Sequence, residues 1–307
     1  MPILLQRWLW VLVGFILIAA PLGLLYLLIR VWEHRHRKRR SPLTRLIPRQ
    51  AGHSLRLRAI SIHEKVLQHA LFVFMLPLIG AAMAYWLQEP LPRFPPTPGQ
   101  TSIVVMTGGV AIYFLFRQWR WMNESRKVSL GLDGEVFVGA ALNRLAEVGC
   151  RVFHDVPLSH GNADHVVVSQ SGVFAVETKM LGKSSDLTGE ATMVVDYERN
   201  QLQFSGRTEK IPTGQAQRQA EILARELSGA IGEPVQVEPI LALPGWKVER
   251  KGKKTVMVIN PVNAEPFFIN SRNVNSPQMI QRISHQLAQM TTDVEPAFRK
   301  ASGWEVG

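Results

Sequence analysis

The amino-acid sequence predicts an α/β domain with a mixed sheet and flanking helices, preceded by three transmembrane helices. Two features of the 307 residues lead to this prediction. Three apolar runs without a charged residue lie within the first 118 residues. After residue 130 the apolar residues follow a helical spacing, then form short runs typical of strands, and then return to a helical spacing. The order helix, strand, hairpin, helix is that of a small α/β core with a mixed sheet.

The apolar runs have lengths close to those of membrane-spanning helices. They contain 22, 18 and 16 residues, at positions 8–29, 70–87 and 101–116. A helix of about 20 apolar residues crosses the hydrocarbon core of a bilayer, so the third run is long enough only if Arg117 extends its charged end to the interface. We expect one transmembrane helix in residues 1–30 and a hairpin of two in residues 69–118. The alternatives are a cleaved signal peptide for the first run and buried core helices for the other two.

The distribution of basic residues predicts the orientation of these helices. Residues 30–68 contain 11 Lys or Arg and two acids, whereas the connection between the second and third runs contains one Arg. Because positively charged loops stay on the cytoplasmic side, we expect residues 31–68 to form a basic cytoplasmic loop and the N-terminus to lie outside. The chain after the third run is then cytoplasmic, and the protein is a multi-pass protein of the inner (plasma) membrane.

The net charge of +11 belongs to the N-terminal part of the chain. Residues 1–118 contain 14 basic and 3 acidic side chains, and residues 119–307 contain 21 of each. The basic residues therefore predict contact with a bilayer that contains anionic lipids, with binding of nucleic-acid phosphates as the alternative. Beyond the membrane part we expect a linker at residues 119–130, one domain at residues 131–295 and a loose tail at residues 296–307.

The expected elements of this domain follow one another closely. Apolar residues at helical spacing predict a helix that begins near Gly131, has Glu135 in its first turn and ends at Gly149. A short strand at residues 151–156 and a hairpin at residues 164–179 come next. The further expected elements are a hairpin at residues 191–204, a helix from Thr213 to about Leu227, strands at residues 235–243 and 255–259, and a helix at residues 276–290.

The hairpin at residues 164–179 brings charged groups to one face of the sheet. Two apolar runs flank residues 171–172, which are expected to form the tight turn and to place Asp164 opposite Lys179. Side chains two residues apart on a strand share a face, so Glu177 joins Lys179, and Asp164 lies across from both. Two carboxylates and an ammonium group therefore converge.

This cluster of charges predicts a metal site. Two neighbouring carboxylates are costly to bring together unless a divalent cation neutralises them, and their hard oxygen atoms suit Mg²⁺, or Mn²⁺ in its place. Such an ion polarises a scissile phosphate and lowers the pKa of an attacking water. Lys179 would orient that water or stabilise the charge that grows on the phosphate. The other interpretation is a surface Glu/Lys pair on an edge strand.

The sequence around this hairpin resembles a known family. The residues that carry the resemblance are Gly134-Glu135-x-x-Val138, His154-Asp155-Val156-Pro157-Leu158, Asp164-His165-Val166-Val167-Val168, Gly172-Val173-Phe174-Ala175-Val176-Glu177-x-Lys179 and Gln215. Over roughly residues 128–240 the chain resembles the NERD (nuclease-related) domain, which belongs to the restriction-endonuclease-like, PD-(D/E)xK superfamily.

The resemblance implies a restriction-endonuclease-like mixed sheet and a set of site residues. It implies Asp164 and Glu177 as Mg²⁺ ligands and Lys179 as the catalytic cation. It also implies Glu135 as an accessory acid on the preceding helix and Gln215 as a site residue on the following one. Many enzymes of this superfamily cut duplexes as pairs, so a homodimer is one state that the resemblance suggests, and the sequence leaves the oligomeric state open.

Two functions are compatible with the sequence. The first is a membrane-anchored Mg²⁺-dependent nuclease that hydrolyses phosphodiester bonds of DNA or RNA at the cytoplasmic face. The alternative is a catalytically inactive membrane adaptor that uses the same fold to bind nucleic acid or protein. Other chemistries are excluded. Cys150 is the only cysteine, so intrachain disulfides and a four-cysteine zinc module cannot form, and the chain contains no phosphate-binding glycine motif of a nucleotide-driven motor.

Overall fold

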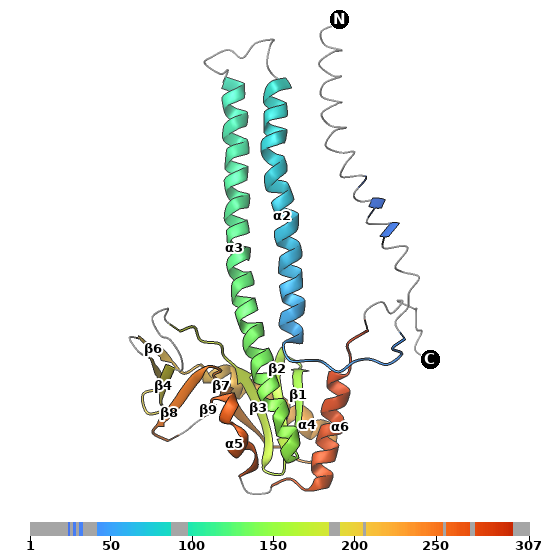
Figure 1. The fold of residues 1–307 in the computed structure, drawn as a ribbon, viewed down its shortest axis with the longest axis vertical. Helices are drawn as coiled ribbons and strands as arrows, with labels where there is room; N and C mark the ends of the chain where they lie inside the picture. Colours follow the sequence, from blue (N-terminus) through green and yellow to red (C-terminus); the bar gives the residue numbers. More distant parts are fainter. Residues whose placement is uncertain are drawn as a thin grey trace, which may run out of the picture. The chain divides into compact units, whose positions relative to one another are not determined.

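The computed structural model describes residues 42–86, 98–183, 191–204, 207–253, 256–270 and 274–296, together with residues 24, 27, 28, 31 and 32. Contacts divide the chain into two compact units. The first includes residues 61–125, and the second consists of residues 45–60 and 126–295. Figure 1 gives the order of the elements along the chain and their labels.

The described part of the first unit consists mainly of segments of two long helices, α2 (His53–Trp86) and α3 (Pro98–Asn143). They run side by side in Figure 1. The Gln118 side chain of α3 donates a hydrogen bond from Nε2 to the Val66 carbonyl of α2 at 3.2 Å. The Arg117 guanidinium lies 5.0 Å from the centre of the Trp121 ring. The ring centre of His69 on α2 lies 4.2 Å from that of Trp121, so polar and aromatic contacts join the two helices.

The structure describes two of the three apolar runs of the sequence and very little of the first. The run at residues 8–29 lies almost wholly outside the described residues. The run at residues 70–87 belongs to α2 apart from its last residue, and the run at residues 101–116 belongs to α3, so both are helical. Within the part of the chain that the structure describes, no helix combines the length and the apolar character needed to cross a bilayer.

The helix α3 continues without a break through the region where the sequence suggests a linker. Residues 119–130 and Gly131 lie inside this helix, so Glu135 lies far from its first turn. Gly131 suggested a helix start, but its role is close packing. A Cβ at this position would lie 3.2 Å from a side-chain carbon of Leu55. A glycine within a helix weakens it modestly, and tertiary contacts offset that cost here.

The second unit is built on two β-sheets. The first sheet has the strand order β1-β2-β3-β7-β9. Its strands are β1 (Arg151–Pro157), β2 (Asn162–Ser169), β3 (Gly172–Thr178), β7 (Val237–Ala242) and β9 (Met257–Ile259). The pairs β1–β2 and β2–β3 are antiparallel, and β3–β7 and β7–β9 are parallel. The mixed sheet that the sequence predicts is therefore confirmed.

The second sheet has the strand order β6-β5-β4-β8. Its strands are β4 (Ala191–Asp196), β5 (Gln201–Phe204), β6 (Arg207–Lys210) and β8 (Trp246–Lys251). A separate apolar core packs this sheet against β7, β9 and the start of α4, with the buried Trp246 ring as its largest side chain. The indole N–H of Trp246 donates a hydrogen bond to the Leu181 carbonyl at 3.1 Å, so this core is also linked to the segment that follows β3.

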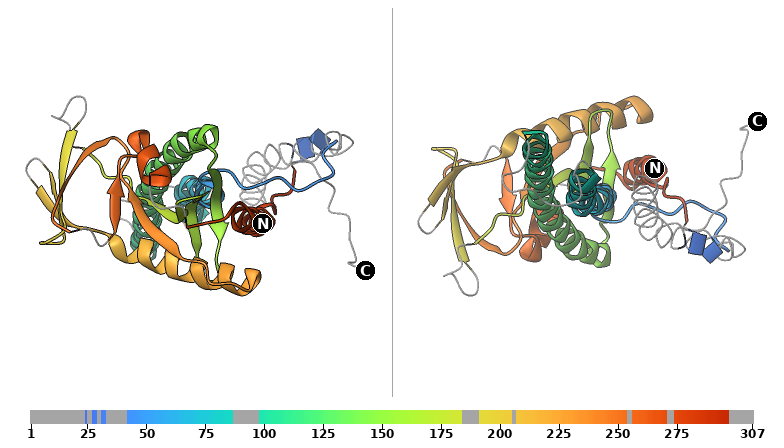
Figure 2. Two further views of the ribbon diagram at one scale, coloured as in Figure 1. Left: turned by 90° about the horizontal axis from the view of Figure 1, so that it is seen from below. Right: turned by 90° about the horizontal axis from the view of Figure 1, so that it is seen from above.

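Helices cover both faces of the five-stranded sheet, as Figure 2 shows. The end of α3, the 3₁₀ turn η1 (Arg144–Val148) and α5 (Glu265–Ile269) pack on one face. The helices α4 (Thr213–Ile231) and α6 (Pro277–Thr291) pack on the other, and the short 3₁₀ turn η2 (Pro261–Asn263) connects β9 to α5. Val167 of β2 belongs to the first core and its neighbours Val166 and Val168 to the second. The three consecutive valines thus reflect a strand that is buried on both faces.

The β2–β3 hairpin has a register that differs from the predicted one. Ser169 pairs with Gly172, so the turn begins one residue earlier than expected. Continuing this ladder places Asp164 level with Glu177 and not with Lys179. The pairing has moved by two residues in total. Because side chains alternate with a period of two, each of these charged side chains keeps its predicted face of the sheet.

The Ser169 side chain explains the position of the turn. Its hydroxyl accepts a hydrogen bond from the Ser171 N–H at 3.1 Å and donates one to the Phe268 carbonyl at 2.7 Å. The hydroxyl therefore closes the turn from inside and joins it to α5. A serine that bonds the backbone N–H two residues further on favours a turn at that point.

Candidate functional site

A pocket of about 480 Å³ in the second unit contains all five side chains that the sequence singles out. They are Glu135, Asp164, Glu177, Lys179 and Gln215. They come from α3, from β2, from β3 and the residue directly after it, and from the first turn of α4. The structure therefore brings together every residue of the predicted site.

Asp164 is held at the floor of the pocket by the strand beside it. Its carboxylate oxygen Oδ2 accepts a hydrogen bond from the Thr178 backbone N–H at 2.7 Å. Burial raises the pKa of Asp164 well above its ordinary value, and the nearby charges of Glu177 and Glu135 raise it further. The hydrogen bond from Thr178 opposes this shift but does not cancel it. Asp164 is thus fixed in position, and binding of a proton or a cation to its carboxylate is electrostatically favoured.

The pKa values of Glu135 and Glu177 are raised as well. Burial raises the pKa of Glu135 to about 7, with further contributions from the charges of Asp155 and Glu177. Burial also raises the pKa of Glu177 to about 7, although a hydrogen bond from Gln219 and the charge of Lys179 oppose the rise. In each of the two glutamates the oxygen Oε2 is buried and has no hydrogen-bond partner among the described residues. Two carboxylate oxygens are therefore available to a ligand.

These oxygen atoms fit a hydrated divalent cation. The described residues contain no group of three Asp, Glu, His or Cys side chains that could enclose a metal ion by themselves. Mg²⁺ does not need such a cage, because it usually keeps several waters and takes one or two carboxylates from the protein. Asp164 and Glu177, level with each other on adjacent strands, would hold it. The unpartnered Oε2 of Glu177 is the observation that supports this fit.

Lys179 follows directly on β3. Its backbone N–H donates a hydrogen bond to the Ala242 carbonyl at 2.9 Å, so the β3–β7 pairing extends one residue past the end of the strand. This bond fixes the backbone of Lys179, and the residue lines the pocket. The ammonium charge opposes the effect of burial, which raises the pKa of Glu177.

Gln219 is a residue of the site that sequence reasoning missed. It lies one helical turn after Gln215 on α4 and is buried. Its Nε2 donates a hydrogen bond to the Asn162 carbonyl at 2.8 Å, and its side chain also hydrogen-bonds Glu177. Residues four apart lie on one face of a helix, so the spacing from Gln215 was the signal that could have found it.

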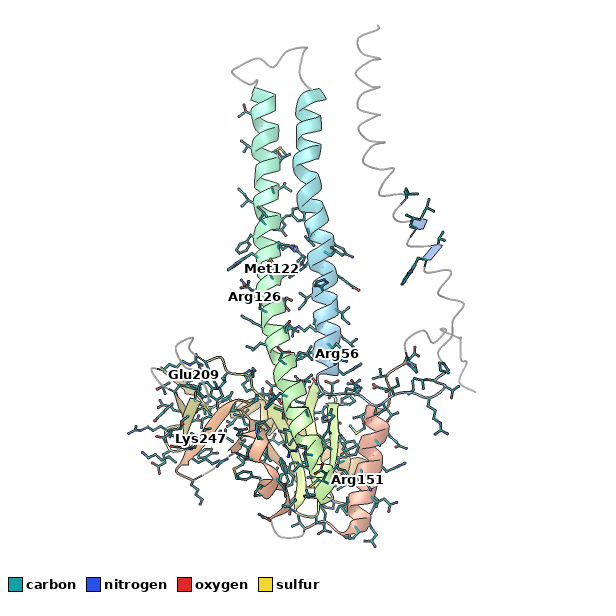
Figure 3. All side chains as sticks on the ribbon, viewed as in Figure 1. Arg56, Met122, Arg126, Arg151, Glu209 and Lys247 are labelled. Carbon is teal, nitrogen blue, oxygen red and sulfur yellow. The ribbon has the colours of Figure 1, made fainter. Side chains whose placement is uncertain are left out.

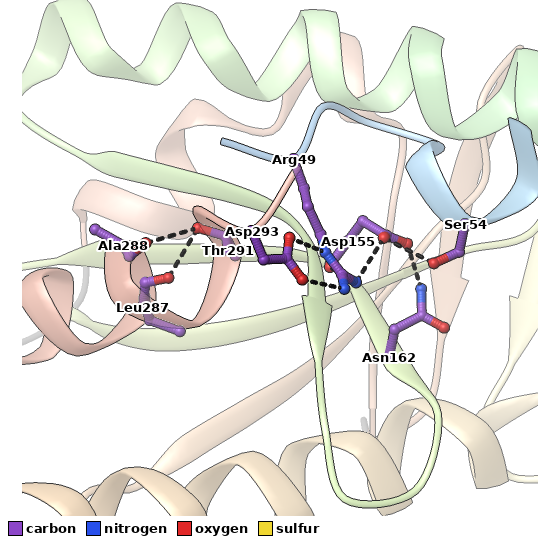
Figure 4. A network of polar contacts seen from close by, with 8 residues as sticks. All are labelled: Arg49, Ser54, Asp155, Asn162, Leu287, Ala288, Thr291 and Asp293. Atoms are coloured by element: carbon purple, nitrogen blue, oxygen red, sulfur yellow. Dashed lines mark hydrogen bonds and ion pairs between the residues drawn. The ribbon is translucent and has the colours of Figure 1, made fainter. Parts of the chain in front are cut away.

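A second missed feature is the network around Asp155, drawn in Figure 4. Asp155 is fully buried and has a left-handed backbone conformation, with φ of 49°. Its carboxylate accepts hydrogen bonds from Arg49 at 3.0 Å, Ser54 at 2.8 Å and Asn162 at 2.6 Å. Arg49 also forms two hydrogen bonds with Asp293, which together with Asp155 raise the pKa of the guanidinium.

This network lies beside the pocket. Asn162 lines the pocket, and its side-chain amide donates a hydrogen bond to Asp155. The charge of Asp155 also contributes to the raised pKa values of Glu135 and Asp164. Arg49 and Asp155 are separated by 106 residues in the chain, so no local pattern in the sequence could connect them.

The histidines near the hairpin do not join the pocket. His154 and His165 lie on paired positions of β1 and β2, with their Nδ1 atoms 2.9 Å apart. Burial lowers the pKa of His154 to about 4 and that of His165 well below its ordinary value, so both are neutral at pH 7. His165 does point away from the acidic cluster, as the alternation along β2 predicts. His160 is exposed and contacts the Ser159 carbonyl.

Comparison with known proteins identifies one region of the chain. Residues 130–244 match the family model of the nuclease-related domain, NERD. The match includes all five predicted site residues and ends just after β7. It leaves out β8, β9, α5 and α6, although these elements complete both sheets and their cores. Neither the curated proteins nor the solved structures yielded a match to this chain.

Removal of divalent cations should make the stability of the protein fall as the pH rises. In the unfolded chain Glu135 and Glu177 ionise near their ordinary pKa of 4.5, whereas in the metal-free fold their pKa values are about 7. Between these values the unfolded state loses protons that the folded state keeps, so the free energy of unfolding decreases as the pH rises from 4.5 through 7. We expect a lower melting temperature at about pH 8 than at about pH 5.5 in the presence of a chelator.

Thermal unfolding followed by circular dichroism measures this effect, with and without Mg²⁺. Added Mg²⁺ should raise the melting temperature more at the higher pH, because only ionised carboxylates bind it well. The double variant Glu135→Gln, Glu177→Gln is the control, since it lacks both groups and should lose most of the difference between the two pH values. Identical behaviour of wild type and variant would contradict the assignment of these pKa values.

Proposed function

We propose that this protein is a membrane-anchored nuclease that uses Mg²⁺ to hydrolyse phosphodiester bonds of DNA or RNA. One observation carries the proposal. Three buried carboxylates and a lysine line a single pocket within a nuclease-related domain. A pocket that held these acids for structural reasons alone would satisfy their oxygens, yet two of the carboxylate oxygens are buried without a partner among the described residues.

In this proposal each residue of the pocket has a separate task. Bound at Asp164 and Glu177, Mg²⁺ would polarise the phosphate and lower the pKa of a bound water. The backbone N–H of Thr178 fixes Asp164, and Gln219 fixes Glu177. Lys179 would bring its positive charge to the non-bridging phosphate oxygens, where negative charge grows during the reaction.

Glu135 is suited to move a proton. Its Oε2 has no hydrogen-bond partner among the described residues, and in the metal-free pocket its pKa is about 7. It enters the pocket from α3, on a different element from the hairpin that supplies the other two acids. We therefore assign it the task of accepting the proton of the attacking water, on the strength of its position and its unpartnered oxygen and not of its pKa in the metal-free pocket.

Attachment to a membrane is the second part of the proposal, and it rests on the sequence. Three uncharged apolar runs precede the nuclease-related domain, and 11 basic residues stand between the first and the second. This asymmetry favours a cytoplasmic position for the domain, with the basic segment close to anionic lipid headgroups of the inner membrane.

Cleavage of nucleic acid by the purified full-length chain tests the proposed reaction. Wild type should cut DNA or RNA in the presence of Mg²⁺ or Mn²⁺ and not in a chelator. Lys179→Ala should reduce the rate about 100- to 1000-fold, by analogy with the loss of other groups that stabilise charge in a transition state. Asp164→Asn should abolish metal-dependent cleavage. The control is Lys247→Ala, which removes an exposed lysine of β8 that does not line this pocket.

A folded wild-type protein that binds nucleic acid but cuts neither DNA nor RNA would support the inactive adaptor instead. In that case the Lys179→Ala variant should behave as wild type in every cellular assay, because an adaptor needs no catalytic cation.

Extraction of cell membranes tests the proposed attachment. The full-length chain should remain in the membrane fraction after an alkaline carbonate wash and should be released by detergent, because apolar helices inside a bilayer are not removed by breaking electrostatic contacts. Release of the chain by high salt or carbonate alone would contradict this part of the proposal and would indicate surface binding through the basic segment.

A further inference from the structure

Residues far outside the nuclease-related match form one wall of the pocket. Ser54, Leu55 and Arg58, from the first two turns of α2, line it together with the five residues described above. They precede the matched region by more than 70 residues. Lys127 of α3, also outside the match, lines the same pocket. All of these residues belong to the second unit.

The start of α2 is held firmly in this position. Ser54 bonds the buried Asp155 carboxylate at 2.8 Å, and the backbone of Gly52 forms a hydrogen bond with Glu135. Packing is tight as well: a Cβ at Gly139 of α3 would lie only 2.5 Å from Cβ of Ala51. This wall is therefore part of the folded site, and the backbone that carries its side chains is fixed in position.

The charges of the pocket are divided between its floor and its rim. The floor carries the buried acids Glu135, Asp164 and Glu177, and the exposed Arg58 and Lys127 lie at the rim. Cations at the rim add to the charges of the proposed Mg²⁺ and of Lys179, and together they favour the approach of a phosphodiester to a pocket that contains three acids. Arg58 is suited to this task because its planar guanidinium can donate two parallel hydrogen bonds to a phosphate.

We propose that Arg58 and Lys127 bind a backbone phosphate of the nucleic acid next to the bond that is cut. The start of α2 and residue 127 of α3 are thus a substrate-binding extension of the nuclease-related domain. This inference rests on the proposed function, since it assigns the substrate contacts of the same pocket. The N-terminal end of α2, at this wall, adds the positive end of a helix dipole to the two side chains.

Binding of a fluorescent oligonucleotide by the full-length chain tests the proposal apart from cleavage. The probe is a single-stranded DNA or RNA of about 20 nucleotides, followed by fluorescence anisotropy in Ca²⁺ in place of Mg²⁺. We expect Arg58→Gln and Lys127→Gln each to weaken binding about tenfold, the size of one lost charge-assisted hydrogen bond. Each should also reduce the slope of log affinity against log salt by about 1.

Two matched variants separate this site from general electrostatic attraction. Arg56 of α2 and Arg126 of α3, labelled in Figure 3, are exposed cations beside the proposed contacts that do not line the pocket. Arg56→Gln and Arg126→Gln remove the same charge from the same helices and should change affinity less than twofold. Equal losses in all four variants, or no loss in any, would overturn the proposal.

The outcomes also distinguish this inference from the proposed reaction. Selective loss of binding in the Arg58 and Lys127 variants, without cleavage by wild type, would support the phosphate site and refute hydrolysis. Cleavage by wild type with unchanged affinity in both variants would support hydrolysis and refute the phosphate site. Vesicles that contain anionic phospholipid serve as a second probe. If the two variants lose vesicle binding but keep oligonucleotide binding, the phosphate belongs to a lipid and the proposal fails.

Discussion

The chief physical constraint on the second unit is that three buried carboxyl groups share one pocket. Glu135, Asp164 and Glu177 are each withdrawn from water. The charge of Glu177 raises the pKa of both Glu135 and Asp164, and the charge of Glu135 raises the pKa of Asp164 further. Burial of several like charges opposes folding unless protons or a cation neutralise them. Because the acids repel one another, contacts with other parts of the domain hold them in place, such as those of Thr178 with Asp164 and of Gln219 with Glu177.

Both local and long-range pairings hold these groups in place. Antiparallel pairing of β2 and β3 sets Asp164 level with Glu177. A further buried acid, Asp155, forms an ion pair with the guanidinium of Arg49, which also reaches Asp293 after α6. The backbone bridge between Ile47 and Val294 joins the same two chain regions. The segment before α2 and the segment after α6 are thus joined to each other and to β1 beside the pocket.

Much of the site could be predicted from sequence because its key pattern is local. The two-residue alternation along the hairpin placed Asp164, Glu177 and Lys179 on one face, and an error of one residue in the turn shifted the pairing by two and left those faces unchanged. The turn itself depends on the hydrogen bond of Ser169 with Phe268, 99 residues away, which no local pattern reveals. The glycine at position 131 predicted a helix start, whereas its contact with Leu55 explains it as a packing site within α3. Arg49 was missed because its partner Asp155 is 106 residues away, and Arg58 because the pocket that it lines is formed by residues far along the chain.

In the proposed function an ion, and not only protons, neutralises the pocket at neutral pH. The most direct test is a crystal structure of the protein grown with Mn²⁺, with the ion located by its anomalous scattering. The predicted result is a peak in contact with carboxylate oxygens of Asp164 and Glu177, at roughly 2.1 Å from each, completed by waters. A pocket without such a peak, in which the acids instead share protons and bond one another, would contradict the account.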